Sequence, residues 1–287
     1  MTALIGEVTR RLPDRWLAAT LGPGVLWLAV AVLAVRLGQA DALSVDAVTR
    51  TARQIGDLVG DRPAQAVVYG LLALAAAVVV SSAARLLGAG IRTMWLGRWR
   101  GPAAWPARLL SEWRARRART RLKRAGTRLP ESYLPHCPTW IGDRLRLADV
   151  RVTAQYGLSL ALVWPRLWQL VDADTRTLVQ QARDRFDLAG TLAGWAAWYC
   201  VLVVFWWPGA VIAAVLVSVA WWRGRIAAAV FGDAVEATVD LKHRALTEAL
   251  GHRLEPGTPL PPATADAIND QLHKGATPQP LRDGPAA

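Results

Sequence analysis

The sequence has little cysteine, little lysine and little histidine. Its two cysteines, Cys137 and Cys200, are too few to form the disulfide framework that stabilises small secreted domains. No further Cys or His pair stands at ligand spacing from His136 and Cys137, so we predict neither a zinc site nor another cofactor. With 53% hydrophobic residues and a mean hydropathy of +0.21, the chain is also too apolar to be disordered.

Motifs that carry familiar chemistry are missing as well. The sequence has no P-loop, no dinucleotide-binding glycine pattern, no nucleophile elbow and no zincin motif. The centres of its long apolar runs hold no charged residue and no histidine, whereas coupled pumps and transporters usually need such groups there. We therefore predict that the protein is neither an enzyme nor an active transporter.

The sequence does have three long runs without charge. They cover Trp16–Val35, the stretch between Arg62 and Arg85, and Leu188–Trp222. About 20 apolar residues suffice to cross ~30 Å of hydrocarbon, so the third run is long enough to cross, turn and return. The prediction is an all-α integral membrane protein with a small helical cytoplasmic unit and four transmembrane helices, at about 17–36, 66–88, 189–206 and 209–223.

The turn inside the third run is predicted from Trp206-Trp207-Pro208-Gly209. Proline removes a helical hydrogen-bond donor, and glycine tolerates the backbone angles of a tight turn. The alternative is one long, kinked helix. A cleaved signal peptide is an alternative for the first run, although that run is longer than a typical signal sequence.

Arginines beside the apolar runs predict the orientation of the chain in the membrane. Positive residues concentrate before the first run, after the second and after the fourth predicted helix, whereas residues 37–61 carry more acids than bases. The predicted location is therefore a bacterial plasma membrane, crossed several times, with the N- and C-termini in the cytoplasm. Ser44 is predicted to cap an amphipathic outer helix that carries Val45, Val48 and Ala52.

These patterns divide the chain into six segments. They are an N-terminal transmembrane hairpin with its outer helix (1–91), a basic Arg/Trp-rich juxtamembrane segment (92–128), a helical cytoplasmic unit (129–188), a second transmembrane hairpin (189–223), a cytoplasmic helix extension (224–251) and a Pro-rich flexible tail (252–287). Within the tail, residues 263–273 are predicted to be briefly helical.

The basic segment contains twelve Arg or Lys residues and a single acid, Glu112. Three interpretations compete: attraction to anionic inner-leaflet lipid with Trp rings as anchors, binding of nucleic acid, and a topology signal with no other role. Its position next to a predicted span favours lipid and makes nucleic acid an improbable partner. The predicted lipid-binding residues are Trp105, Trp113, Arg114, Arg116, Arg117, Arg119, Arg121, Lys123 and Arg124.

Within the cytoplasmic unit, Thr139 is predicted to cap a helix, and a second helix from Tyr156 is predicted to end near Pro165. The order Trp164-Pro165-Arg166-Leu167-Trp168 suggests a guanidinium between two indoles, which is a cation–π arrangement.

One constellation could carry chemistry. Asp233, Glu236, Asp240 and His243 are spaced three, four and three residues apart, so they share one stripe of a helix. We expect the acids to pair with arginines of the cytoplasmic unit, such as Arg144, Arg151 or Arg166. The alternative is that the stripe binds a metal ion or acts in acid–base catalysis, which normally needs ligands from a second element.

Three stretches of this sequence resemble a group of actinobacterial multi-span membrane proteins. They are Pro138-Thr139-Trp-Ile-Gly142-Asp143-Arg-Leu-Arg, then Tyr156-Gly157-Leu158 with the Trp164–Trp168 element, and Gly232-Asp233-Ala-Val-Glu236-Ala. The sequence departs from the group's pattern at Asp143, where the group has Asn, and at Ser159, where it has Asp. The resemblance covers residues 138 to 250. It implies a membrane architecture and no activity, since none is established for the group.

We therefore expect a scaffold or signal-relay protein with two partners, anionic lipid and a cytoplasmic protein. Two alternatives stay open. One is a pore assembled as a homo-oligomer, and the other is a metal-dependent membrane enzyme that uses the acidic stripe.

Overall fold

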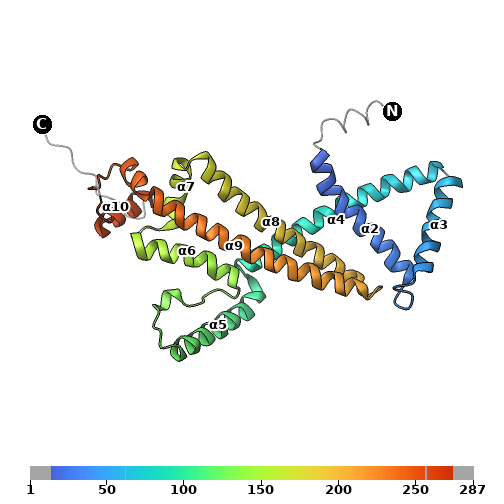
Figure 1. Cartoon of the computed structure of the whole chain (residues 1–287), viewed down its shortest axis with the longest axis horizontal. Coiled ribbons are helices and arrows are strands. Elements are labelled where there is room, and N and C mark those ends of the chain that lie inside the picture. The colour runs from blue at the N-terminus through green and yellow to red at the C-terminus, as the bar shows by residue number, and fades with distance from the viewer. Residues whose placement is uncertain (1–13, 62, 256, 274–287) are drawn as a thin grey trace. The chain divides into compact units, whose positions relative to one another are not determined.

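The computed structural model describes residues 14–61, 63–255 and 257–273, and this part of the chain is helical apart from turns and connections (Figure 1). It contains nine α-helices and no strand, so the predicted all-α fold class is confirmed for the described residues. The helices are α2 (Asp14–Leu37), α3 (Val45–Asp61), α4 (Pro63–Trp95), α5 (Ala104–Arg124), α6 (Trp140–Tyr156), α7 (Leu160–Leu170), α8 (Ala173–Leu202), α9 (Pro208–Ala249) and α10 (Pro262–Leu272).

The chain forms two compact units, which are described separately. The first unit consists of Met1–Arg92 and Asp187–Trp222, and the second of Thr93–Phe186 and Arg223–Ala287. Helices α8 and α9 contribute residues to both units.

Two helices of the described chain are long and apolar enough to cross a membrane, namely Ala64–Trp95 in α4 and Pro208–Ala249 in α9. The apolar window of α4 is only 11% buried, and side chains such as Val67, Leu71 and Val79 are more than half exposed. The core helix of a soluble protein would be mostly covered, because large apolar surfaces in contact with water are unfavourable. The exposed surface of α4 therefore fits contact with lipid.

Helix α2 (Asp14–Leu37) covers the predicted span at 17–36, whereas the predicted span in α8 is shorter than the sequence suggested. The apolar part of α2 described with side chains is Gly22–Leu37. Helix α8 ends at Leu202, so its uncharged part begins at Leu188 and rises by only about 22 Å at ~1.5 Å per residue. Four membrane-spanning helices are thus not shown by the structure.

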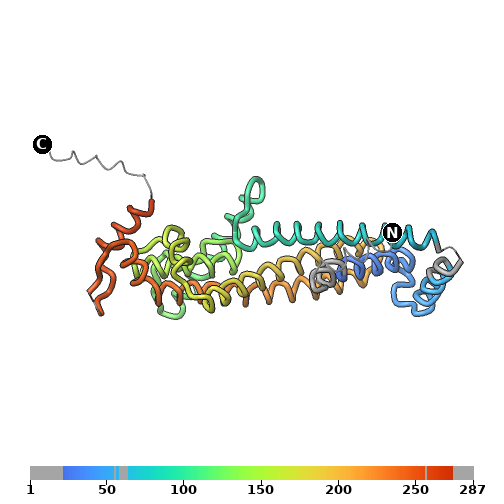
Figure 2. Tube along the Cα trace, turned by 90° about the horizontal axis from the view of Figure 1, so that it is seen from above, coloured from blue at the N-terminus to red at the C-terminus, as the bar shows by residue number. Residues whose placement is uncertain are grey.

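The predicted break in the third uncharged run is present, but it lies a few residues earlier. Helix α8 ends at Leu202 and α9 begins at Pro208, so residues 203–207 form the turn, and α8 and α9 run side by side from it in both views (Figures 1 and 2). Pro208 opens a helix rather than occupying the turn, because the first helical position needs no backbone donor.

This turn binds the connection that follows α2. The Gln39 side chain donates to the carbonyls of Val203 and Val204 at 2.9 and 3.0 Å and accepts from the Trp207 amide at 2.9 Å. The Trp206 indole donates to the Ala42 carbonyl at 2.9 Å. The two connections therefore lie at the same end of the first unit. At its start, α3 has the predicted cap, where Ser44 Oγ accepts from the Ala47 amide at 3.2 Å.

Small residues let helices α4 and α8 pack closely in the first unit. A Cβ on Gly88 would lie 2.6 Å from the Gly190 carbonyl oxygen, and a Cβ on Gly194 would overlap the Ala84 carbonyl. Gly190 and Gly194 are four residues apart, as are Ala84 and Gly88, and such pairs allow helix backbones to approach in membrane proteins. This contact was not foreseen from the sequence.

The second unit has its own core, made by the ends of α6 and α9 together with α7 and α10. Leu158, Val163, Leu167, Val239 and Leu246 are all at most 1% exposed. Helix α6 ends at Tyr156, where Gly157 adopts φ +70°, the left-handed conformation that glycine accepts without steric strain.

Two boundary predictions in this unit were wrong. Pro165 does not end a helix: α7 begins at Leu160 and passes through Pro165 to Leu170, because the tight packing of Val163 and Leu167 outweighs the lost backbone bond. The brief helix predicted for residues 263–273 is present as α10 (Pro262–Leu272), but it is not part of a flexible tail, because its Ala265 and Ile268 are fully buried. Asn269 also holds α10 in place by donating to the Gly157 carbonyl at 2.8 Å.

Candidate functional site

Helix α5 carries most of the predicted lipid-binding residues and presents many of them to solvent. We call the exposed side of this helix the outer face of α5; it consists of Trp105, Leu109, Trp113, Arg116, Arg117, Thr120, Lys123 and Arg124. Their spacings place these residues within about a third of the helix circumference. The single buried residue described for the helix, Ala107, lies on the opposite side.

The outer face of α5 changes character along the helix. Its first half is apolar and aromatic, with Trp105 70% exposed and Trp113 54% exposed. Its second half is basic, and the Arg117 guanidinium lies 5.2 Å from the centroid of the Trp113 ring in a cation–π contact. Indole rings next to arginines match the interface of a bilayer, where rings sit at headgroup level and guanidinium groups meet phosphates.

Two arginines near this face have acidic partners. Arg116 pairs with Glu112 at 3.2 Å, and Arg119 pairs with Glu131 at 2.6 Å, with all four side chains largely exposed. Exposed pairs of this kind contribute at most about 1 kcal/mol, so they are easily exchanged for other anions. Within the described residues, no acid lies within ion-pair distance of Arg117, Arg121, Lys123 or Arg124.

Arg114 does not belong with the lipid-facing residues, which corrects the prediction from the sequence. Its side chain is only 19% exposed, its Nη1 lies 2.8 Å from Asp143 Oδ2, and it donates to the Cys137 carbonyl at 2.6 Å. Arg114 is on the side of α5 that faces α6. Its charge therefore stabilises the second unit instead of reaching a membrane.

Asp143, the partner of Arg114, organises the start of α6. Its Oδ1 accepts from the backbone amides of His136 and Cys137, each at 2.8 Å. One turn earlier the predicted cap is present, since Thr139 Oγ1 accepts from the Gly142 amide at 3.0 Å. Burial raises the pKa of the Cys137 thiol, and the negative charge of Asp143 raises this pKa further. Both effects disfavour the thiolate form of Cys137.

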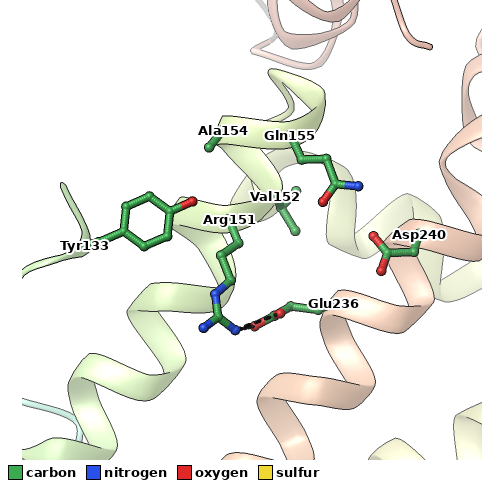
Figure 3. Close-up of a pocket in the computed structure, with 7 residues that line it drawn as sticks. All are labelled: Tyr133, Arg151, Val152, Ala154, Gln155, Glu236 and Asp240. Atoms are coloured by element: carbon green, nitrogen blue, oxygen red, sulfur yellow. Dashed lines mark hydrogen bonds and ion pairs between the residues drawn. The ribbon is translucent and has the colours of Figure 1, made fainter. Parts of the chain in front are cut away.

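The acidic stripe on α9 faces arginines of α6, as the sequence led us to expect, and Figure 3 shows one of these pairs, Arg151 with Glu236. Arg144 pairs with Asp233 and lies 2.9 Å from Glu236, and Arg151 lies 3.1 Å from the second oxygen of Glu236. Arg166, also expected as a partner, is not part of this cluster. A cavity of about 270 Å³ opens beside the ion pairs, with Glu236 and Asp240 among its lining residues (Figure 3).

The other two stripe residues contact Tyr156 instead of an arginine. The Tyr156 hydroxyl donates to Asp240 Oδ1 at 2.8 Å, and the Tyr156 and His243 rings lie 4.5 Å apart. Desolvation, the hydrogen bond and the charge of Asp240 together raise the pKa of Tyr156 to about 12. Among the described residues, no group of three or more His, Cys, Asp or Glu is arranged to hold a metal ion.

The expected cation–π contact of Arg166 was wrong. Trp164 and Trp168 do approach each other, with ring centroids 5.9 Å apart, but Arg166 donates to the Leu162 carbonyl at 2.8 Å. The cation near Trp168 is Arg176 of α8, 5.6 Å from the ring centroid. Sequence neighbours on a helix point in different directions, so a residue two positions from an indole does not cover its face.

An apolar cavity in the second unit was missed by sequence reasoning. Helices α6, α7 and α9 leave an apolar cavity of about 360 Å³ lined by Leu145, Leu160, Trp164, Phe231 and Val235, among others. Its residues come from three separate helices, each of which reads as an ordinary apolar stripe. Only their packing brings them together.

Fold and site thus define an all-α protein with two helices able to span a membrane and a basic, tryptophan-bearing helix exposed in its second unit. No protein-family model, no curated protein and no solved structure matches the chain. The chemistry of the site is therefore the guide to function, since a fold by itself does not determine function.

Proposed function

We propose that this chain is a non-enzymatic scaffold or signal-relay protein of a bacterial plasma membrane, with the outer face of α5 in contact with anionic lipid. The observation that carries the proposal is the exposure of Trp105 and Trp113 beside a row of arginines and a lysine. Each basic residue near an anionic surface contributes roughly 1 kcal/mol, so the three cations of the outer face without an acidic partner, Arg117, Lys123 and Arg124, supply about 3 kcal/mol before salt screening.

A membrane crossed four times is part of this proposal. The exposed apolar surface of α4 supports it, as do the hydrogen bonds between Gln39 and the turn at 203–207. These bonds support placing the connection after α2 and the α8–α9 turn on the same side of the bilayer. The arginine distribution makes that side external and leaves both termini and the second unit in the cytoplasm. The resemblance to actinobacterial multi-span proteins agrees with this arrangement and remains a prediction.

The ion pairs between α6 and α9 support a structural role for the acidic stripe. Asp233 and Glu236 are neutralised by Arg144 and Arg151, and Asp240 accepts a hydrogen bond from Tyr156. Because the partners of these acids are protein side chains, they serve to hold the second unit together.

Protection from trypsin tests the lipid contact on the full chain. The protein is reconstituted in vesicles of neutral phosphatidylcholine and in vesicles with about one third phosphatidylglycerol, and cleavage is followed at each site. We expect anionic lipid to slow cleavage within α5 about tenfold and to leave cleavage after the exposed Arg253 unchanged. The variant Trp105→Gln/Trp113→Gln keeps every cleavage site and should lose most of the protection. Equal cleavage of α5 in both kinds of vesicle would contradict the proposal.

Reporter fusions test the topology separately. Fusions after Gln39, Arg128 and Leu254 should report an external, an internal and an internal location. An external report at Arg128 would exclude contact of α5 with the inner leaflet. A protein released from vesicles by alkaline carbonate would exclude the membrane-spanning helices.

A further inference from the structure

A groove lies between α5 and the connection that precedes α6. Its volume is about 530 Å³, within the range of small-ligand sites. Arg117 and Arg121 of α5 contribute to its lining, together with the apolar side chains of Leu122, Leu129 and Leu134. It is thus basic at one part of its lining and apolar at another, a combination that matches an amphiphilic ligand.

The basic part of the groove carries uncompensated charge. Arg117 and Arg121 are four residues apart, so they are neighbours on one side of α5. No lining residue of the groove is acidic. The third arginine in the lining, Arg114, is neutralised by Asp143, which leaves two guanidinium groups for an anion. Guanidinium groups bind phosphate through paired, charge-assisted hydrogen bonds.

The apolar part of the groove limits what that anion can be. Leu129 is 50% exposed and Leu134 is 6% exposed, so hydrophobic surface extends from the mouth of the groove inward. A free phosphate or a nucleic-acid backbone would cover the guanidinium groups and leave this apolar surface in water. A lipid headgroup followed by methylene groups satisfies both parts, with each buried methylene contributing about 0.8 kcal/mol in general.

We infer that this groove binds the headgroup of one anionic phospholipid, with its phosphate between Arg117 and Arg121 and the first part of an acyl chain along Leu122, Leu129 and Leu134. The volume accommodates a headgroup and glycerol backbone, while the remaining chain stays in the bilayer. The inference rests on the proposed lipid contact and adds to it, because a groove holds one lipid at a defined place whereas a charged face attracts many without order.

Titration of the full chain with phosphatidylglycerol in neutral-detergent micelles tests the inference, with bound lipid counted by native mass spectrometry. The test variant is Arg117→Gln/Arg121→Gln. Its matched control is Arg98→Gln/Arg100→Gln, which removes the same charge from two exposed arginines of the basic segment that lie outside the groove and outside the outer face of α5. A second variant, Ala118→Phe, fills the groove without changing charge, and Ala118 belongs to its lining.

The wild type and the control should retain one phosphatidylglycerol with saturable binding, whereas Arg117→Gln/Arg121→Gln should bind it at least tenfold more weakly. Ala118→Phe should lose the retained lipid and keep the trypsin protection of α5 in anionic vesicles. If both double variants lost binding equally, the groove assignment would be overturned, although the charged outer face could still contact lipid. Displacement of the lipid by glycerol phosphate at equal affinity would assign the groove to a soluble phosphate and also overturn the inference. Absence of lipid binding together with absence of trypsin protection would refute the proposed function as well.

Discussion

The substitution Arg114→Ala tests whether a single ion pair anchors α5 to the second unit. Arg114 is the partner of Asp143, whose side chain is only 8% exposed and which accepts the amides of His136 and Cys137. Removing the guanidinium leaves a buried carboxylate with two backbone donors and only one, more distant cation, Arg146, whose Nε lies 3.8 Å from Asp143 Oδ1. It also leaves the Cys137 carbonyl without its hydrogen bond from Nη1.

The expected loss is about 3 kcal/mol, at the lower end of the ~3–5 kcal/mol typical for breaking a buried pair, because Arg114 is 19% exposed. Since 1.36 kcal/mol corresponds to a factor of ten, the local opening equilibrium should rise roughly 100-fold. Asp143→Asn should cost less, about 1–2 kcal/mol, because the amide oxygen still accepts the two backbone N–H groups.

Hydrogen–deuterium exchange of the full chain in micelles measures this opening at the amides of His136 and Cys137. The matched control is Arg116→Ala on the same helix, which removes only an exposed pair with Glu112 and should change exchange by less than about threefold. If Arg114→Ala accelerated exchange no more than Arg116→Ala does, the ion pair would not be an anchor, and the reasoning from burial would be refuted.

Two further predictions concern helix packing and pH. Gly194→Leu should destabilise the protein in detergent by about 1–3 kcal/mol, measured by thermal unfolding, because its side chain would meet the Ala84 carbonyl. Gly70→Leu, whose side chain would meet nothing within 4 Å, should have little effect. Equal effects of the two substitutions would exclude the close α4–α8 contact. Because the pKa of Tyr156 is raised to about 12, its neutral form stabilises the fold below pH 10, and this contribution is lost as the pH rises from about 10 to about 12. Ultraviolet titration of Asp240→Asn should show the Tyr156 pKa moved back toward 10, and an unchanged curve would contradict the contact.

Much of the helical fold is predictable from the sequence because its causes are local. Runs without charge mark α4 and the first part of α9, and the Ser44 and Thr139 side chains mark the starts of α3 and α6. Pro165 was wrongly predicted to end a helix, and the packing of the predicted helix α10 into the core was missed, because tertiary contacts outweigh the local signal of proline. In both places, buried residues such as Val163 and Ile268 hold a helix that proline content alone argues against.

The candidate sites show the same division. The pairing of the α9 acids with Arg144 and Arg151 followed from an unusual stripe and a nearby supply of arginines. The inward position of Arg114 did not follow, because twelve similar cations in one segment give no local reason to separate one from the rest. The helical spacing of Arg114 was the available signal, because Arg114 shares one side of α5 with Ala107, Ala118 and Leu122, which are small or apolar. The groove is lined in part by Leu134, which lies in the connection ten residues after α5 ends at Arg124. Helical periodicity does not predict where that connection packs.

The inward ion pair also sets the axial rotation of α5. No continuous apolar stripe runs along this helix, so apolar packing does little to fix its rotation about its long axis. The ion pair between Arg114 and Asp143 therefore stabilises one rotational orientation of α5 relative to the others. Moving that arginine to position 113 or 115 would favour an orientation of α5 rotated by about 100°. A different set of side chains would then be exposed, although the composition of the helix stayed the same.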